Sequence, residues 1–121
     1  MKKILLIEDD FFLTDIYSLK LKEAGFDVSV AVDGEEGLAK IKEEKPDLVL
    51  LDIVLPKIDG WQILKKIRSD EDLKTIKVIL LSNINQRYDV EKGIKLGADK
   101  YLIKAFFTPE EVIEEIKKLL E

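Results

Sequence analysis

Short apolar runs alternate with longer amphipathic stretches five times along this chain. The first, third and fourth runs are almost free of polar residues, which is typical of parallel strands covered by helices on both faces. The second and fifth runs are more polar, so we expect them at the edges of the sheet. The alternation predicts repeated βα units that build one parallel sheet. The expected strands are Lys3–Ile7, Asp27–Ala31, Leu48–Leu51, Lys77–Leu81 and Lys100–Ile103.

The stretches between the runs carry signals of helix starts. Asp33 and Thr108 are each followed by a glutamate three residues later, as in a capping box. Pro109 suits the first position of a helix, where its missing N–H is not needed. The weakest of the five expected helices runs from about Tyr88 to Leu96, because few of its residues can pack against a sheet. These packing residues are Val90, Gly93 and Ile94.

Composition limits both the domain count and the chemistry. We expect one domain spanning residues 1–121, because 121 residues are near the commonest domain size. Cysteine and histidine are both absent, which excludes disulfides, thiolate or imidazole metal sites and triads that use histidine. The net charge of -5 argues against direct binding of nucleic acid. The first apolar run ends after Ile7, too early for an export signal, and no run is long enough to span a membrane, so we expect a cytoplasmic protein.

Polar side chains follow four of the expected strands. Glu8 and Asp9 come after the first strand, Asp52 after the third, Ser82 after the fourth and Lys104 after the fifth. Right-handed crossovers place the carboxyl ends of parallel strands at one edge of the sheet, so these groups should converge. Close carboxylates favour a bound cation, and Mg²⁺ suits a set of oxygen ligands. The chemistry that fits such a site is transfer of a phosphoryl group to a carboxylate.

Four segments in this order resemble the receiver domain of two-component response regulators. They are Glu8-Asp9, the stretch from Asp52 to Gly60 with Pro56 and Asp59, Leu81-Ser82, and the stretch from Gly97 to Lys104. The resemblance covers essentially the whole chain. It implies a flavodoxin-like, doubly wound α/β fold with strand order 2-1-3-4-5 and helices on both faces. The strand order then reverses between the first and third strands, beside Asp9 and Asp52.

The resemblance also implies roles for individual residues at a magnesium site. Asp52 matches the residue that accepts the phosphoryl group and also contacts Mg²⁺. Asp9 matches a direct metal ligand, Glu8 the neighbour that holds metal-bound water, and the backbone carbonyl of Val54 a further ligand. The cofactor implied is therefore Mg²⁺, held by Glu8, Asp9, Asp52 and Val54.

Three further residues match the machinery of phosphorylation and switching. Ser82 and Lys104 correspond to the hydroxyl and the lysine that contact the phosphoryl group. Tyr101 corresponds to the aromatic residue that turns inward on activation, so Ser82 and Tyr101 form the implied switch. The implied phosphoryl donor is a sensor histidine kinase or a phosphotransfer protein. The downstream partner is an unidentified protein that binds the surface of the last two helices and the fifth strand.

Such a module catalyses only its own phosphorylation and dephosphorylation, so we do not expect an enzyme. We expect a monomer, or a weak dimer that forms on phosphorylation. Two positions depart from the family pattern, Ala105 in place of proline and Asn83 in place of a very small residue. Receivers with proline at the first position typically have a cis bond there, but a non-proline cis bond costs roughly 2.5 to 4 kcal/mol. We therefore expect a trans bond between Lys104 and Ala105, a rerouted loop fixed by Phe106 or Phe107, and a lysine that still reaches the site.

Three other functions remain as alternatives. A pseudo-receiver would keep the fold as an interaction module without switching by phosphorylation, and the two departures are its support. A magnesium phosphatase with an aspartate nucleophile would need a second acid where Val54 stands. A flavin-binding protein would need a hydroxyl-rich phosphate loop after the first strand, where Glu8, Asp9 and Asp10 would repel a phosphate.

Overall fold

A computed structural model describes residues 1–121 and contains one parallel sheet. Its strand order is β2-β1-β3-β4-β5, which confirms the predicted fold class and the edge positions of β2 and β5. The strands are β1 (Lys3–Ile7), β2 (Asp27–Ala31), β3 (Leu48–Leu51), β4 (Lys77–Ser82) and β5 (Lys100–Ile103). The fourth strand is one residue longer than predicted, so Ser82 is its last residue.

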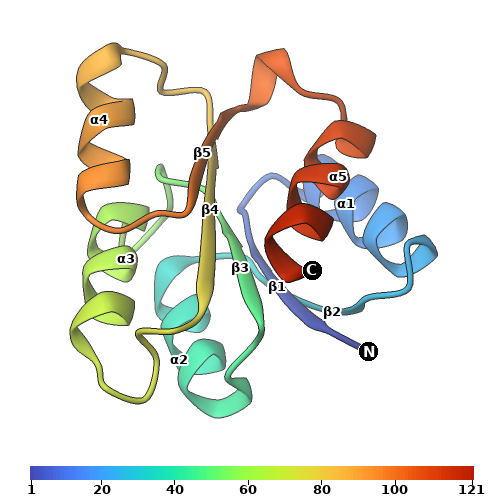
Figure 1. The fold of residues 1–121 in the computed structure, drawn as a ribbon, viewed down its shortest axis with the longest axis horizontal. Coiled ribbons are helices and arrows are strands. Elements are labelled where there is room, and N and C mark those ends of the chain that lie inside the picture. The colour runs from blue at the N-terminus through green and yellow to red at the C-terminus, as the bar shows by residue number, and fades with distance from the viewer.

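Helices cover both faces of the sheet (Figure 1). One face carries α1 (Phe11–Glu23) and α5 (Pro109–Leu120), and the other carries α2 (Gly34–Glu44), α3 (Gly60–Ser69) and α4 (Arg87–Lys95). Side chains alternate between the faces along each strand, so Leu5 and Ile7 enter the core under α2 and α3, while Ile4 and Leu6 enter the core under α1 and α5. No helix has both the length and the apolar character of a membrane span.

Side-chain caps define the starts of four helices. The Asp33 carboxylate accepts the N–H of Glu36, and the Thr108 hydroxyl accepts the N–H of Glu111, as the sequence predicted. The Glu111 carboxylate also accepts the N–H of Thr108, which completes a capping box. Glu36 instead forms an ion pair with Lys40. The other two capped helices are α1, whose cap is Asp10, and α3, whose cap is Asp59.

The packing expected for the fourth helix is only partly correct. Gly93 is buried against the side chains of Leu80 and Tyr101, and Val90 is half-buried. Ile94, which we expected to pack inward, is 49% exposed. Successive helical residues are about 100° apart around the axis, so when Gly93 faces the sheet its neighbour points outward. This helix has no side-chain cap, in agreement with its weak sequence signals.

Candidate functional site

The predicted site residues meet at the carboxyl edge of the sheet. Glu8 follows β1, Asp52 follows β3, Ser82 ends β4, and Lys104 follows β5 as the first residue of a 3-10 turn, η1 (Lys104–Phe106). The parallel register pairs Ile7 with the residue before Asp52, so the first two side chains leave their strands at the same level. Because the connections from β1 and β3 lead to helices on opposite faces, an opening remains between these strand ends.

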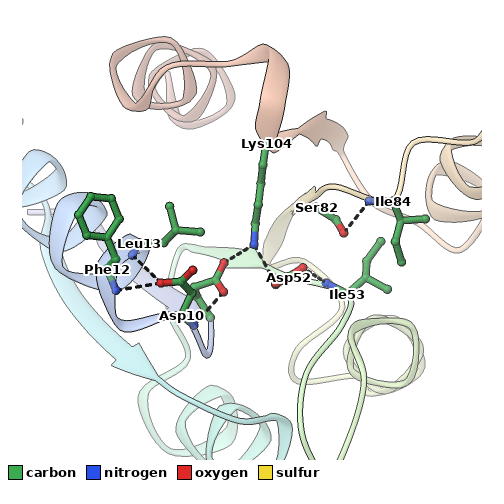
Figure 2. A network of polar contacts seen from close by, with 9 residues as sticks. Asp10, Phe12, Leu13, Asp52, Ile53, Ser82, Ile84 and Lys104 are labelled. Carbon is green, nitrogen blue, oxygen red and sulfur yellow. Dashed lines mark hydrogen bonds and ion pairs between the residues drawn. The ribbon is translucent and has the colours of Figure 1, made fainter.

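Lys104 joins two buried carboxylates at the centre of the site. Its Nζ atom lies 2.6 Å from Glu8 Oε1 and 2.9 Å from Asp52 Oδ2, and Figure 2 shows the side chain extending from its backbone towards Asp52. The second oxygen of Glu8 accepts the N–H of Asp10 at 3.1 Å, and the second oxygen of Asp52 accepts the N–H of Ile53 at 2.7 Å. All four carboxylate oxygens therefore have a donor although both residues are buried.

Burial and charge shift the titration of this group. Burial raises the pKa of Glu8 above its ordinary value of 4.5, and the charge of Asp52 adds to the rise despite the hydrogen bond from Lys104. Burial lowers the pKa of Lys104, but its hydrogen bonds to Glu8 and Asp52 outweigh burial and leave the pKa above 10.5. The ammonium therefore stays charged at neutral pH and balances part of the carboxylate charge.

The carboxylates of Glu8, Asp9 and Asp52 fit a divalent cation. Their nearest oxygens all lie within 4.8 Å of one another, and Asp9 is exposed while the other two are buried. A hard cation such as Mg²⁺ takes oxygen ligands and keeps several waters, so one exposed and two buried carboxylates suit it. The predicted ligand Val54 lies in the loop after Asp52, and the residue is 63% exposed.

A pocket of about 330 Å³ opens beside Asp52. Its lining residues are Asp52, Val54, Ser82, Asn83, Ile84 and Lys104. It is large enough for a phosphoryl group together with water, because one water takes about 30 Å³ of liquid volume. Asn83, one of the two departures from the family pattern, is on the rim and leaves this pocket open.

The backbone of Ile84 connects the predicted switch residues. Its N–H donates to Ser82 Oγ at 3.3 Å, drawn in Figure 2, and its carbonyl accepts the hydroxyl of Tyr101. Burial raises the pKa of Tyr101 to about 12, with contributions from the charges of Asp89 and Asp52. No residue type in the sequence marks this link, because the group between the two side chains is main chain.

The trans bond agrees with the prediction for the position after Lys104. The chain contains no cis peptide bond, so the bond between Lys104 and Ala105 is trans. The backbone then makes the 3-10 turn, Phe106 is exposed, and Phe107 packs against the core under α1 and α5. The lysine nevertheless reaches Asp52, so the loss of proline leaves this contact intact.

The loop after Asp52 depends on a glycine whose packing the sequence did not reveal. The N–H of Gly60 donates to the carbonyl of Ile53 at 2.8 Å. A Cβ atom on Gly60 would lie 2.4 Å from the carbonyl oxygen of Asp52, so no side chain fits there. The only signal in the sequence was the Asp59-Gly60 pair, which also resembles an ordinary turn and helix start.

Comparisons with known proteins agree with this geometry. The model of the response regulator receiver domain family matches residues 4–117. The DNA-binding dual master transcriptional regulator RpaA of Synechocystis sp. is 41% identical over 120 residues, 99% of this chain and 49% of that protein. The alkaline phosphatase synthesis transcriptional regulatory protein PhoP of Bacillus subtilis is 38% identical over 119 residues, 98% of this chain and 48% of that protein.

A solved structure gives the same result at the level of the fold. The receiver domain of Francisella response regulator 1452 has a TM-score of 0.91 and 32% identity, and the match covers 98% of this chain and 96% of that one. The chain spans about half the length of the curated relatives that it matches. With the family model matching nearly all residues, the chain belongs to the response regulator receiver domain family.

Proposed function

We propose that this chain is a phosphoacceptor module of a two-component phosphorelay, phosphorylated on Asp52. The observation that carries the proposal is the contact of Lys104 with Asp52, 2.9 Å apart, at the wall of a pocket that Ser82 also lines. An ammonium beside a carboxylate and an open pocket provides both a nucleophile and a positive charge for the incoming phosphoryl oxygens. This contact favours a phosphoacceptor over the pseudo-receiver alternative, despite Ala105 and Asn83.

Transfer from a phosphohistidine involves one bond made and one broken. A carboxylate oxygen of Asp52 bonds to phosphorus, the phosphorus–nitrogen bond breaks, and its electron pair stays on the leaving imidazole. Lys104 then pairs with a phosphoryl oxygen, and Glu8 and Asp9 hold the cation side of the site, with the Val54 carbonyl as a further ligand. Bound Mg²⁺ supplies positive charge that offsets the charge of the phosphoryl group.

Ser82 and Tyr101 are the proposed switch. The Ser82 hydroxyl accepts the N–H of Ile84 in the present structure, so its hydrogen is free to donate to a phosphoryl oxygen. A turn of this hydroxyl towards the phosphoryl group weakens its bond to Ile84, whose carbonyl is held by Tyr101. The displacement thereby reaches the surface formed by α4, β5 and α5, where we place the downstream protein partner.

The donor and the output follow from the family. We propose a sensor histidine kinase or phosphotransfer protein as the donor, and no catalytic activity beyond the module's own phosphorylation and dephosphorylation. The relatives RpaA and PhoP are named as transcriptional regulators and are about twice as long as this chain. Control of transcription is therefore one output that a longer protein with this receiver could have. For residues 1–121 alone, with a net charge of -5, we propose a cytoplasmic monomer, or a weak phosphorylation-dependent dimer, without direct nucleic-acid contacts.

Intact mass after incubation with acetyl phosphate and Mg²⁺ tests the phosphoacceptor. We expect one phosphoryl group on the wild type and none on Asp52→Asn. The matched control is Asp59→Asn in the same loop, because asparagine caps a helix as well as aspartate and the site keeps all its residues. Equal labelling of Asp52→Asn and the wild type contradicts the assignment, and so does an unlabelled wild type.

A further inference from the structure

The loop between β3 and α3 is held at two points. At its start, Gly60 fixes Asp52 and Ile53 through the close approach described above. Further along, the turn from Pro56 to Ile58 rests on the first residue of α2. Only Val54 and Leu55 lie between these two points.

The contact with α2 is made by the backbone of Gly34. Its N–H donates to the carbonyl of Pro56 at 3.1 Å, and the same carbonyl accepts the N–H of Ile58 at 2.9 Å. A Cβ atom on Gly34 would lie 1.8 Å from the carbonyl oxygen of Ile58 and 2.6 Å from its carbon. Such contacts with backbone atoms cannot be relieved by a side-chain rotation, so any residue other than glycine must push the turn away from α2.

Two further features keep this turn close to α2. Lys57 has a φ of 71°, in the left-handed region that ordinary residues adopt only when the surroundings enforce it. Its ammonium lies 3.6 Å from the Asp33 carboxylate that caps α2. The hydrogen bond from Glu36, together with the charge of Lys57, lowers the pKa of Asp33, so this carboxylate stays charged at neutral pH.

We propose that Gly34 is a positioning residue for the magnesium site, which rests on the function proposed above. By seating the turn from Pro56 to Ile58 against α2, Gly34 fixes the loop that carries the Val54 carbonyl next to Asp52. A displaced turn moves this carbonyl relative to the carboxylates and weakens cation binding. Groups that orient metal ligands typically change metal affinity by roughly 10-fold or more when they are altered.

Calorimetric titration with Mg²⁺ alone tests the effect of Gly34→Ala. We expect its dissociation constant to rise about 10-fold. The matched control is Gly37→Ala, one turn further along α2, where the added methyl meets side-chain atoms of Ile7 and no backbone, the nearest being the terminal Cδ1 at 2.7 Å. We expect this variant to bind Mg²⁺ like the wild type. A purely structural role for Gly34 would lower the unfolding temperature and leave the dissociation constant of the folded protein unchanged, which would overturn the inference.

Amide hydrogen exchange of the wild type tests the same link without a substitution. If opening of the contact between Gly34 and Pro56 abolishes cation binding, Mg²⁺ at 100 times its dissociation constant slows exchange of the Gly34 amide by about 100-fold. If Mg²⁺ does not change the exchange rate of the Gly34 amide, the inference is overturned. This test uses the wild type, so it decides the question even if Gly34→Ala does not fold. A failure of this inference is distinguishable from a failure of the proposed function. If the wild type is labelled on Asp52 and binds Mg²⁺, the proposed function stands and only the role of Gly34 is refuted.

Discussion

Replacement of Lys104 by methionine tests how the buried carboxylates are held together. Lys104 is the only cation within reach of Glu8 and Asp52, whose side chains are 4% and 8% exposed. Methionine keeps most of the volume of the lysine stem but removes the charge and both hydrogen bonds. The variant therefore leaves two carboxylates together without a counter-charge, which is costly for buried groups.

The unfolding free energy that the two unbalanced carboxylates cost at pH 7 has an upper limit. Without the ammonium, Glu8 can take up a proton rather than remain charged beside Asp52. Its unfolded pKa is near 4.5, so protonation at pH 7 spans 2.5 pH units and costs about 3.4 kcal/mol at 1.36 kcal/mol per unit. We therefore expect protonation of Glu8 to cost Lys104→Met up to about 3 kcal/mol of unfolding free energy at pH 7. With roughly 2.1 cal/mol/K of unfolding entropy per residue over 121 residues, the unfolding temperature falls by up to about 12 °C.

The dependence on pH has a definite sign. The folded pKa of Glu8 in the variant lies above its unfolded pKa, so the protonated form stabilises the fold at low pH. This contribution is present below pH 4.5 and is lost as the pH rises towards the folded pKa. Because the pKa of Glu8 is already raised in the wild type, the deficit of Lys104→Met relative to the wild type should grow with pH where only the variant keeps Glu8 protonated, by up to about 1.4 kcal/mol per unit, and should be smallest at pH 4.5.

Urea unfolding from pH 4.5 to 7 in the presence of a chelator measures this deficit. The matched control is Lys100→Met in β5, whose lysine lies 3.0 Å from Glu115 with side chains 33% and 19% exposed. For this more exposed pair we expect a loss below about 1 kcal/mol that is constant from pH 5 to 7. If Lys104→Met behaves like Lys100→Met, the lysine does not neutralise the buried carboxylates in the way proposed.

Two further predictions concern the lifetime of the phosphoryl group and the alkaline range. Val54 and Ile84 cannot orient an attacking water, so Val54→Asn with Ile84→Glu should speed phosphoryl loss roughly 30-fold, at about 1 kcal/mol for each added hydrogen bond. Unchanged decay by intact mass after donor removal contradicts this. Burial raises the pKa of Tyr17 from 10 to about 12, so its stabilisation is complete below pH 10 and is lost as the pH rises towards 12. Tyr17→Phe should flatten the fall in unfolding free energy over this range, and an equally steep fall in urea unfolding would rule the explanation out.

Most of the fold could be predicted because the apolar composition of the strands shows that they are buried. The runs around Leu5, Val49 and Ile79 are apolar at almost every position, which is typical of a parallel sheet covered on both faces. Once these strands are placed, their carboxyl ends locate Glu8 and Asp52 without any knowledge of side-chain contacts. The order of the strands came from the resemblance to receivers and not from the runs themselves.

What the sequence could not reveal is a set of contacts made through the main chain. Ile84 links Ser82 to Tyr101 through its N–H and carbonyl, which every residue possesses, so no residue type marks the position. Gly34 lies under the turn at Ile58, yet a glycine at a helix start has no special pattern. The outward orientation of Ile94 likewise depends on which neighbour the short helix buries.

The charge of the site connects the raised pKa of Glu8 with the need for a cation. Burial, and after it the charge of Asp52, raises the pKa of Glu8. When Glu8, Asp9 and Asp52 are all ionised, Lys104 neutralises only one of three negative charges. Phosphorylation replaces the single charge of Asp52 by up to two, which increases the excess further. The lysine alone cannot balance this charge in a buried pocket, so labelling of Asp52 should depend on a divalent cation. Labelling by acetyl phosphate at the same rate in a chelator as in Mg²⁺ would mean that Lys104 and the solvent are sufficient, and that the three carboxylates have another purpose.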